Sequence, residues 1–542
     1  MSVEKTDRRL AHLAAALLIV VASAQVAGRI ATVARLYEPS LLRDPKTPGL
    51  SPAWPTARPD PSPFLSSNDR SRWGTVRALV EDGTYILGKR DRDLVFQTAF
   101  LPLFQTEWNT ALGSAGAAHR LRLNADSGFL LKEDAWRSVD RVLNPQTLEY
   151  QSSKPPLLPT LVAGPVELLE WLTGWKPSTH PFEVGRAVLL LVNWLPWTLY
   201  LIVFWRLLQR FEVGDAARLV TLALACFATL VQPYLVVFNN HTPGTFCALF
   251  LLHALAVEFL DKRGRAWKSL PGSQLSERIQ VEYLDPPSGA WKNLWLVWAG
   301  LAAGFGVTCE MPELSLAGLA GLLLLARAPG RAVLFYGGAC LLVMAVAVAV
   351  NKVATGRYSP VYSEFGSPWY EYEGSSWYDP GKLKRGIDWA RRNMGETVPE
   401  YAFHLLVGHH GLFSLTPVFA LALPGAWLAA KGRNRDAAAG LLWHFAWMAL
   451  ACTVVLVGFY LIKSDNYGGN CCSARWLQWL TPLLLLAALP AINRLTQTRG
   501  GMALLGVLAF FSIISAASSN HSPWRRPWLY DLMVWAGWPG YD

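Results

Sequence analysis

The chain has 542 residues, of which 52% are hydrophobic and only 16% are charged. Soluble domains carry about 25% charged residues, so this composition excludes an ordinary water-soluble enzyme. The net charge is +10, and in a hydrophobic chain this excess predicts basic cytoplasmic loops rather than a nucleic-acid partner. Seven cysteines in a chain of this length exclude a disulfide-stabilised scaffold.

Eleven apolar runs predict membrane-spanning helices, each of which needs about 20 residues. They cover residues 11–33, 186–205, 216–238, 242–260, 293–309, 312–326, 332–351, 411–430, 437–462, 476–493 and 500–519. The first run follows Lys5, Arg8 and Arg9 and predicts a membrane anchor with a cytoplasmic N-terminus. We therefore expect an all-α polytopic protein of the inner or plasma membrane, with about 11 transmembrane helices.

These spans divide the chain into alternating membrane and external parts. We expect the cytoplasmic start and first helix in 1–33, an external loop with interfacial helices and catalytic motifs in 34–185, membrane helices in 186–351, an external aromatic-rich loop in 352–410, membrane helices in 411–519 and an external tail in 520–542. Every loop assigned to the inner side has Lys or Arg near its membrane ends, and these loops together carry the whole net charge. This pattern supports a cytoplasmic N-terminus and an external C-terminus.

Residues 156–175 are apolar but contain Glu167 and Glu170. Each acid would cost on the order of 3 kcal/mol at a bilayer centre, whereas each leucine returns only about 0.5 kcal/mol. On a helix, the two acids lie opposite an apolar face formed by Leu158, Leu161, Leu168, Leu169 and Leu172. The pattern predicts a helix lying in the membrane interface rather than a span.

The first external loop contains two groups of polar residues with candidate chemistry. Asp69 begins a predicted helix, where it is either a first-turn acid favoured by the helix dipole or a general base. Arg72, three residues on, is either an intrahelical ion-pair partner or a phosphate contact. Lys154 precedes Pro155 and Pro156, and is either part of a rigid helix entry or a ligand of an anionic headgroup.

Further candidates lie at the outer ends of later spans. His241 stands at an ordinary helix start, and Glu310 is placed with Glu313 at a tight outer turn. Carboxylates at membrane depth favour a functional site, whereas at headgroup level they need no such explanation.

A third group follows in the second half of the chain. His409 and His410 enter a span from the outer face; neighbouring histidines on a helix make poor joint metal ligands, but each could donate to a phosphate oxygen. Tyr467 begins a Gly-Gly turn that leads to Arg475, which either contacts phosphate or extends to the interface as a membrane-edge cation.

Taken in order, these features resemble the GT-C superfamily of polytopic glycosyltransferases, and most closely its aminoarabinose-transferase and protein O-mannosyltransferase branch. Members carry an external Asp-Glu-x-Arg-Tyr helix and then a Lys-Pro-Pro motif on an interfacial helix. The corresponding residues here are Asp69-Arg70-Ser71-Arg72-Trp73 and Lys154-Pro155-Pro156. The likeness covers about the first 330 residues and is only architectural beyond them.

The resemblance implies a membrane enzyme that takes a sugar from a polyprenyl-phosphate donor on the outer side, with inversion, and passes it to a lipid, glycan or protein acceptor. It makes Asp69 the catalytic residue and places Lys154 near the donor phosphate. The other candidate substrate-binding residues are Arg72, His241, Glu310, His409, His410, Tyr467 and Arg475. Partners would be the donor and membrane lipids, with no nucleic acid.

Three positions depart from the family pattern. Arg70 replaces the second acid of the first motif, His241 replaces an aspartate before the fourth span, and Glu310 replaces a lysine. These changes leave no firm cofactor, keep a divalent metal open, and leave a catalytically inactive GT-C fold as one alternative. The other alternative, a transporter or lipid flippase, would need broken helices with polar residues at the midplane.

The loop 352–410 is rich in aromatic residues, and two interpretations of them stay open. They form either a platform for a sugar or acceptor, or an interfacial aromatic belt. The residues concerned are Trp369, Tyr370, Tyr372, Trp377 and Tyr378.

Overall fold

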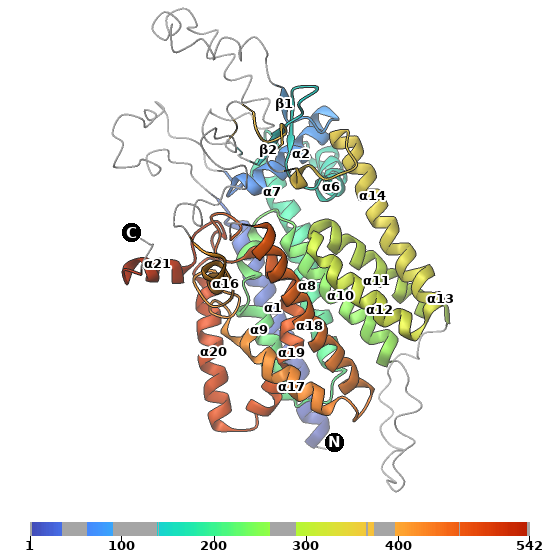
Figure 1. Cartoon of the computed structure of the whole chain (residues 1–542), viewed down its shortest axis with the longest axis vertical. Coiled ribbons are helices and arrows are strands. Elements are labelled where there is room, and N and C mark those ends of the chain that lie inside the picture. The colour runs from blue at the N-terminus through green and yellow to red at the C-terminus, as the bar shows by residue number, and fades with distance from the viewer. Residues whose placement is uncertain are drawn as a thin grey trace, which may run out of the picture.

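The structure, a computed structural model, describes residues 3–34, 62–89, 138, 140–260, 289–364, 367–372, 375, 396–464 and 467–538. Within them the protein is a bundle of long helices with one small sheet at its end (Figure 1). The first half contains α1 (Val3–Ala31), α2 (Ser67–Asp82), β1 (Gly88–Lys89), β2 (Arg141–Leu143), β3 (Glu149–Ser152), α6 (Leu157–Thr173), α7 (Pro181–Leu189), η3 (Leu190–Trp194), α8 (Leu195–Leu208), α9 (Asp215–Phe227), η4 (Gln232–Val236) and α10 (His241–Leu260). The second half contains α11 (Gly289–Cys309), η6 (Met311–Glu313), α12 (Leu314–Arg327), α13 (Pro329–Arg331), η7 (Ala332–Gly337), α14 (Gly338–Thr355), η8 (Val361–Ser363), α16 (Val398–Leu406), η9 (Pro417–Leu421), α17 (Ala422–Gly432), α18 (Ala437–Lys463), η10 (Arg475–Leu480), α19 (Thr481–Leu495), α20 (Arg499–Ala517) and α21 (Trp528–Trp535).

The described helices confirm an all-α, multi-pass membrane protein. Seven of them are long and apolar enough to cross a membrane: Arg9–Ala31, Pro181–Leu208, His241–Leu260, Pro329–Thr355, Ala437–Lys463, Arg475–Leu495 and Arg499–Ala517. The expected runs at 216–238, 293–309, 312–326 and 411–430 form α9, α11, α12 and α17, which are not among the seven. The expected count of about 11 is therefore not confirmed. One reason is local: α9 ends at Phe227 and α17 begins only at Ala422, because short 3₁₀ segments replace regular helix there.

The two ends of the bundle differ in character. The N-terminus of α1 lies at one end, whereas α2, the sheet and α6 gather at the other (Figure 1). A capping box starts α2. The Ser66 side chain accepts a hydrogen bond from the backbone of the first turn, and the Asp69 side chain accepts one from the Ser66 backbone N–H. Gly83 ends the helix in the left-handed conformation, at φ 65°.

The three strands pair in the order β1-β3-β2, all antiparallel. The sequence predicted only short helices here, so the sheet is a difference from expectation. The local signal lies in the loop between β2 and β3, where the Asn144 side chain accepts from the backbone N–H of Gln146 at 2.9 Å, directly after Pro145. This tight turn sends β3 back along β2 and leads the chain to Lys154.

Helix α6 has the amphipathic character expected for residues 156–175. Its inner face packs on α2 and buries Val162 and Val166, whereas Trp171 is 79% exposed. Leu161, Leu168 and Leu172 are exposed beside it, while Leu158, expected on the same face, is buried. The exposed apolar row suits a helix lying in the membrane interface.

The contact between α17 and α19 depends on a glycine. A Cβ on Gly425 would collide with the backbone carbonyl of Ala487, so the two helices meet at backbone distance. We expect Gly425→Ala to lower the free energy of unfolding by about 1–3 kcal/mol, the usual cost of overpacking. Thermal unfolding of the purified protein in detergent measures this change.

The matched control is Gly506→Ala in α20, because a Cβ there meets nothing within 4 Å. Alanine favours a helix over glycine by about 1 kcal/mol, so this variant should be neutral or slightly more stable. Equal melting temperatures for the two variants would contradict the close approach of α17 and α19.

Candidate anion-binding site

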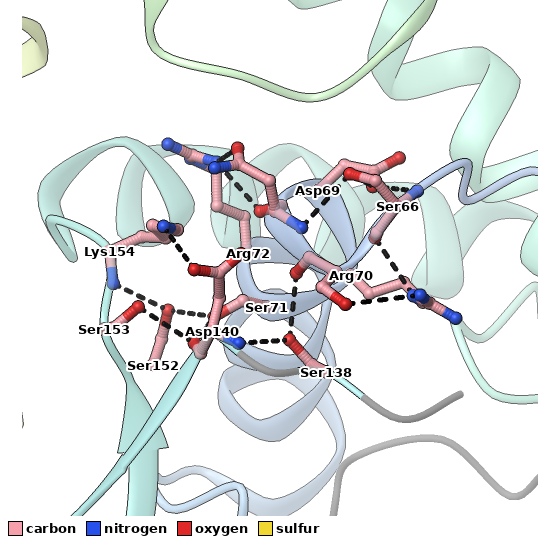
Figure 2. A network of polar contacts seen from close by, with 12 residues as sticks. Ser66, Asp69, Arg70, Ser71, Arg72, Ser138, Asp140, Ser152, Ser153 and Lys154 are labelled. Atoms are coloured by element: carbon pink, nitrogen blue, oxygen red, sulfur yellow. Dashed lines mark hydrogen bonds and ion pairs between the residues drawn. The ribbon is translucent and has the colours of Figure 1, made fainter. Parts of the chain in front are cut away.

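A network of serines joins α2 to the sheet and positions Lys154 (Figure 2). The Ser71 hydroxyl donates to the Asp140 carbonyl at 2.5 Å and lies 2.6 Å from the Ser152 hydroxyl. The Ser153 hydroxyl donates to the same carbonyl at 3.1 Å. With its backbone held in this way, Asp140 accepts an ion-paired hydrogen bond from Lys154 Nζ at 2.7 Å.

Arg72 links this network to the helix bundle. Its buried guanidinium donates to the Asn68 carbonyl at 2.9 Å and to the Asn240 side-chain oxygen, which lies just before α10. The Asn240 amide in turn donates to Glu310 Oε1 at 2.8 Å. His241 Nδ1 is hydrogen-bonded to the same oxygen, so one network joins α2, the start of α10 and Glu310, which are far apart in sequence.

Buried amides hold the turn that presents His241. Asn239 Nδ2 donates to the carbonyls of Tyr234 and Val237, both at 2.8 Å, and its side-chain oxygen accepts from the Thr242 backbone. Asn193, in the π-helical segment η3, accepts from the Thr242 hydroxyl at 2.8 Å. Because these amides are saturated with backbone contacts, the turn is rigid.

Arg475 is a third cation of the group, close enough to Arg72, Lys154 and Asp140 to influence their ionisation. Its guanidinium lies 5.0 Å above the Trp524 ring, and its stem rests against the turn at Gly468. Gly468 has φ 100° and Gly469 φ 74°, so the expected tight Gly-Gly turn is present. Within the described part of the chain, Arg475 Nε is buried without a hydrogen-bond partner and no carboxylate pairs with the guanidinium.

Burial and mutual repulsion shift the ionisation of these groups. Burial, aided by the nearby Arg475 charge, lowers the pKa of the Arg72 guanidinium to about 10. Burial also lowers the pKa of Lys154, against the attraction of Asp140. Burial alone would raise the pKa of Asp140, but Lys154, Arg475 and Arg72 outweigh it and hold the carboxyl below its usual value.

Glu310 behaves differently from Asp140. Burial raises the pKa of Glu310 to about 8, although Arg475 and Arg72 oppose the shift. At neutral pH the site therefore holds three cations, one ionised carboxylate at Asp140 and a largely protonated Glu310. A buried excess of positive charge is costly unless an anion neutralises it, so the site is suited to an anionic ligand.

The raised pKa of Glu310 makes a stability prediction. Because the folded-state value of about 8 lies above the ordinary value of 4.5, this group's contribution is fully present below pH 4.5 and is lost as the pH rises through about 8. Glu310→Gln cannot ionise, so its melting temperature relative to wild type should increase between pH 6 and pH 9. Exposed Glu167→Gln on α6 is the control and should show no such change.

Asp69 lies at the start of α2, away from the Lys154 side of the helix (Figure 2). Its carboxylate accepts from the Leu65 and Ser66 backbone N–H groups at 2.8 and 2.6 Å, and from the Ser66 hydroxyl at 2.8 Å. Burial raises the pKa of Asp69, against the opposing charge of Arg70 and these donors. The contacts are those of a helix cap, and the catalytic role of Asp69 stays a prediction from the resemblance.

The remaining three expected residues form a neighbouring cluster. His410 stacks on Tyr467 with ring centres 4.7 Å apart, and His409 meets the same tyrosine edge-on at 4.8 Å. Tyr467 is adjacent to Gly468, so this histidine cluster borders the turn that carries Arg475. Neither histidine lies on a regular helix, contrary to the geometry assumed from sequence.

Three of the expected aromatic residues pack against the small sheet. Trp369 and Tyr370 share a buried cluster with Val142 and Val361. Tyr372 contacts Tyr150, with ring centres 5.8 Å apart. Trp377 and Tyr378 lie outside the described residues.

Several residues of the cation group and of the histidine cluster were not singled out from the sequence. Asp140 and Asn240 carry no motif; only the chain reversal between β2 and β3, and the cap of α10, bring them to Lys154 and Arg72. Glu396 and His404, which lie beside His409, likewise stand in no recognisable pattern.

No protein-family model and no curated protein matches the chain. Among solved structures, it is similar to the archaeal oligosaccharyltransferase AglB from Archaeoglobus fulgidus. The complex of that protein with an inhibitory peptide and a dolichol-phosphate is 14% identical, with 71% of this chain and 50% of that chain covered and a TM-score of 0.37. Its apo form is 10% identical, with 96% of this chain and 57% of that chain covered and a TM-score of 0.40.

A third structure, of the same oligosaccharyltransferase tethered to an acceptor peptide, is 13% identical, with 71% of this chain and 49% of that chain covered and a TM-score of 0.36. This chain thus spans about half the length of the solved structures it matches. The similarity is weak, and the function proposed below rests on this chain's own residues.

Proposed function

We propose that this protein is a membrane glycosyltransferase that takes a sugar from a polyprenyl-phosphate donor at the outer face of the membrane. The observation that carries the proposal is the cation group of buried Arg72 and half-buried Lys154 and Arg475, which has more positive charge than its carboxylates neutralise. Guanidinium and ammonium groups form strong charge-assisted hydrogen bonds with phosphate oxygens.

The position of the cations suits a lipid-linked ligand. Arg475 begins η10 at the start of a span, and Lys154 lies three residues before α6, whose apolar face is exposed. A phosphate bound among these residues can therefore keep its polyprenyl chain in the bilayer. An anchored donor needs no nucleotide pocket.

The proposed reaction is a single displacement. An acceptor hydroxyl or amine attacks the anomeric carbon, the bond from that carbon to the phosphate oxygen breaks, and the bonding electrons leave with the phosphate. Arg72, Lys154 and Arg475 stabilise the charge that develops on this leaving oxygen. Attack opposite the leaving group inverts the anomeric configuration.

The acceptor proton needs a base, and two assignments compete. The resemblance to the GT-C superfamily assigns the role of this base to Asp69. The contacts favour His241 with Glu310: when the Glu310 carboxyl is ionised it accepts from His241 Nδ1, which leaves His241 Nε2 as the proton acceptor. Among the described residues, this buried Nε2 has no hydrogen-bond partner.

The experiment supplies purified protein in lipid nanodiscs with a panel of polyprenyl-phosphate sugars and measures release of polyprenyl phosphate by mass spectrometry. Turnover of one donor supports the proposal. Binding of polyprenyl phosphate without turnover of any donor would favour an inactive member of this fold. Transbilayer movement of the lipid in proteoliposomes, without cleavage, would favour a flippase.

A further inference from the structure

A second buried cluster lies outside the cation group. Glu396, His404 and His409 each offer one ligand atom, and these atoms all lie within 4.8 Å of one another. Nε2 of His404 and Nε2 of His409 are 4.0 and 3.9 Å from Glu396 Oε1. The His409 side chain is fully buried and the other two are 6% and 7% exposed, so this is an interior site rather than a surface patch.

Local structure brings the three side chains together. Glu396 directly precedes Thr397, whose side chain forms a capping box with Glu400 and starts α16. His404 lies in the last turn of this helix. Gly408 then allows the chain to fold back, because a Cβ there would collide with His404, and the His409 ring stacks on His404 with centres 4.1 Å apart.

Hydrogen bonds fix which atoms face the centre of the cluster. The Tyr467 hydroxyl donates to Glu396 Oε2 at 2.6 Å, which leaves Oε1 directed at the two histidines. His409 Nδ1 is hydrogen-bonded to His410 Nδ1. When His409 is the donor in this bond, its neutral ring carries the lone pair on Nε2.

In this tautomer, His409 Nε2 faces Glu396 Oε1 at 3.9 Å, a separation that one shared metal ion can bridge. Two imidazole nitrogens and one carboxylate oxygen are the ligand set of zinc sites that leave a fourth position for water.

We propose that Glu396, His404 and His409 bind a divalent transition-metal ion of the zinc class. Zinc bonds of about 2.1 Å place neighbouring tetrahedral ligands about 3.4 Å apart. Each Glu–His distance must therefore shorten by about half an ångström, and the ligand atoms of the two stacked histidines, which lie within 4.8 Å of each other, must approach by up to about 1.4 Å as one ring tilts. His410 and Tyr467 act as outer partners that orient His409 and Glu396. The bound metal would pin α16 to the turn at Tyr467, beside Arg475.

The test is metal binding, so it does not depend on glycosyl transfer. The full-length protein in detergent is stripped with a chelator and titrated with Co²⁺, whose visible spectrum reports nitrogen and oxygen coordination, and the Zn²⁺ content is measured by mass spectrometry. We expect one metal per chain, and X-ray absorption of the zinc-loaded protein should show two imidazole ligands. This wild-type measurement needs no variant to fold.

Variants then locate the site. His404→Ala and His409→Ala should each weaken metal binding by about 100-fold or more, and Tyr467→Phe by about 10-fold, as is usual for an outer partner. His444→Ala is the control, because His444 lies on α18, outside the cluster, and is hydrogen-bonded within its own helix to the Gly440 carbonyl at 2.7 Å. No stoichiometric uptake by the wild type, or unchanged uptake in monodisperse His404→Ala and His409→Ala, would overturn the proposal.

Discussion

Replacing Arg475 with alanine is expected to weaken binding of a polyprenyl phosphate by about 10- to 100-fold. A hydrogen bond to a charged group contributes about 1.5–3 kcal/mol, and each 1.4 kcal/mol corresponds to a tenfold change in affinity. Arg475 should show the largest effect of the three cations, because Lys154 is paired with Asp140 and Arg72 is hydrogen-bonded to Asn68 and Asn240, whereas within the described residues Arg475 Nε has no hydrogen-bond partner. Titration of the lipid phosphate into protein in nanodiscs, followed by native mass spectrometry, measures the change.

A matched control separates the anion contact from loss of aromatic packing. Arg433 lies 5.3 Å above the Trp443 ring, as Arg475 lies 5.0 Å above Trp524, but Arg433 is outside the cation group. Arg433→Ala should leave lipid-phosphate binding unchanged, whereas Arg475→Lys should retain part of it, because a lysine keeps the charge but not the planar donor pair. Equal affinities in Arg475→Ala and Arg433→Ala would remove Arg475 from the donor site.

Glu310→Gln is expected to lower donor turnover by about 100-fold or more while lipid-phosphate binding persists. General-base catalysis contributes about 10²–10⁴-fold. Glutamine keeps the size of the group that contacts Asn240 and His241 but cannot ionise, so the proposed base His241 loses the carboxylate that orients it. Wild-type turnover should rise with pH through about 8, since the ionised form of Glu310 is the one that orients His241 for proton transfer. Steady-state release of polyprenyl phosphate at several pH values measures both effects.

Asp69→Asn provides the comparison that decides between the two assignments. In the wild type, backbone N–H groups donate to both Asp69 oxygens, and the NH₂ group of an asparagine cannot accept one of these hydrogen bonds. The variant should therefore be less stable at the start of α2. Its turnover should fall only in proportion to the fraction of unfolded protein. If a stable Asp69→Asn protein lost turnover while Glu310→Gln kept it, the assignment from the resemblance would be right and the His241–Glu310 assignment wrong.

Most of the candidate residues were found from the sequence because each stands at a recognisable boundary. Lys154 precedes two prolines, Arg475 follows a Gly-Gly turn, and Glu310 lies in a short turn between apolar runs. A charged residue beside a long apolar run is conspicuous in a sequence, so each of these residues could be singled out by itself. Their common location could not be predicted in this way, because it arises from contacts such as Arg72 to Asn240, 168 residues apart.

The role of Asp69 shows where local pattern is ambiguous. A first-turn acid is favoured by the helix dipole and equally available for catalysis, and the sequence supports both interpretations. The hydrogen bonds that the Asp69 carboxylate accepts from the Leu65 and Ser66 backbone show that Asp69 caps the start of α2. The histidines show the converse: His409 and His410 could not be assigned to a common site until the chain folded back at Gly408 and brought His404 and Glu396 beside them.

The sequence by itself determined that this is an all-α membrane protein, because a helix that crosses or lies on a bilayer must display its apolar residues in long runs or on one face. The bundle arrangement decided which polar residues share an environment. Ionisation depends on burial and on neighbours within a few ångströms, so the pKa of Glu310 is raised to about 8 while that of Asp140 is lowered, although both are carboxylic acids. The net charge of +10 is the basis for a prediction of topology, whereas the local excess at Arg72, Lys154 and Arg475 exists only in the folded chain.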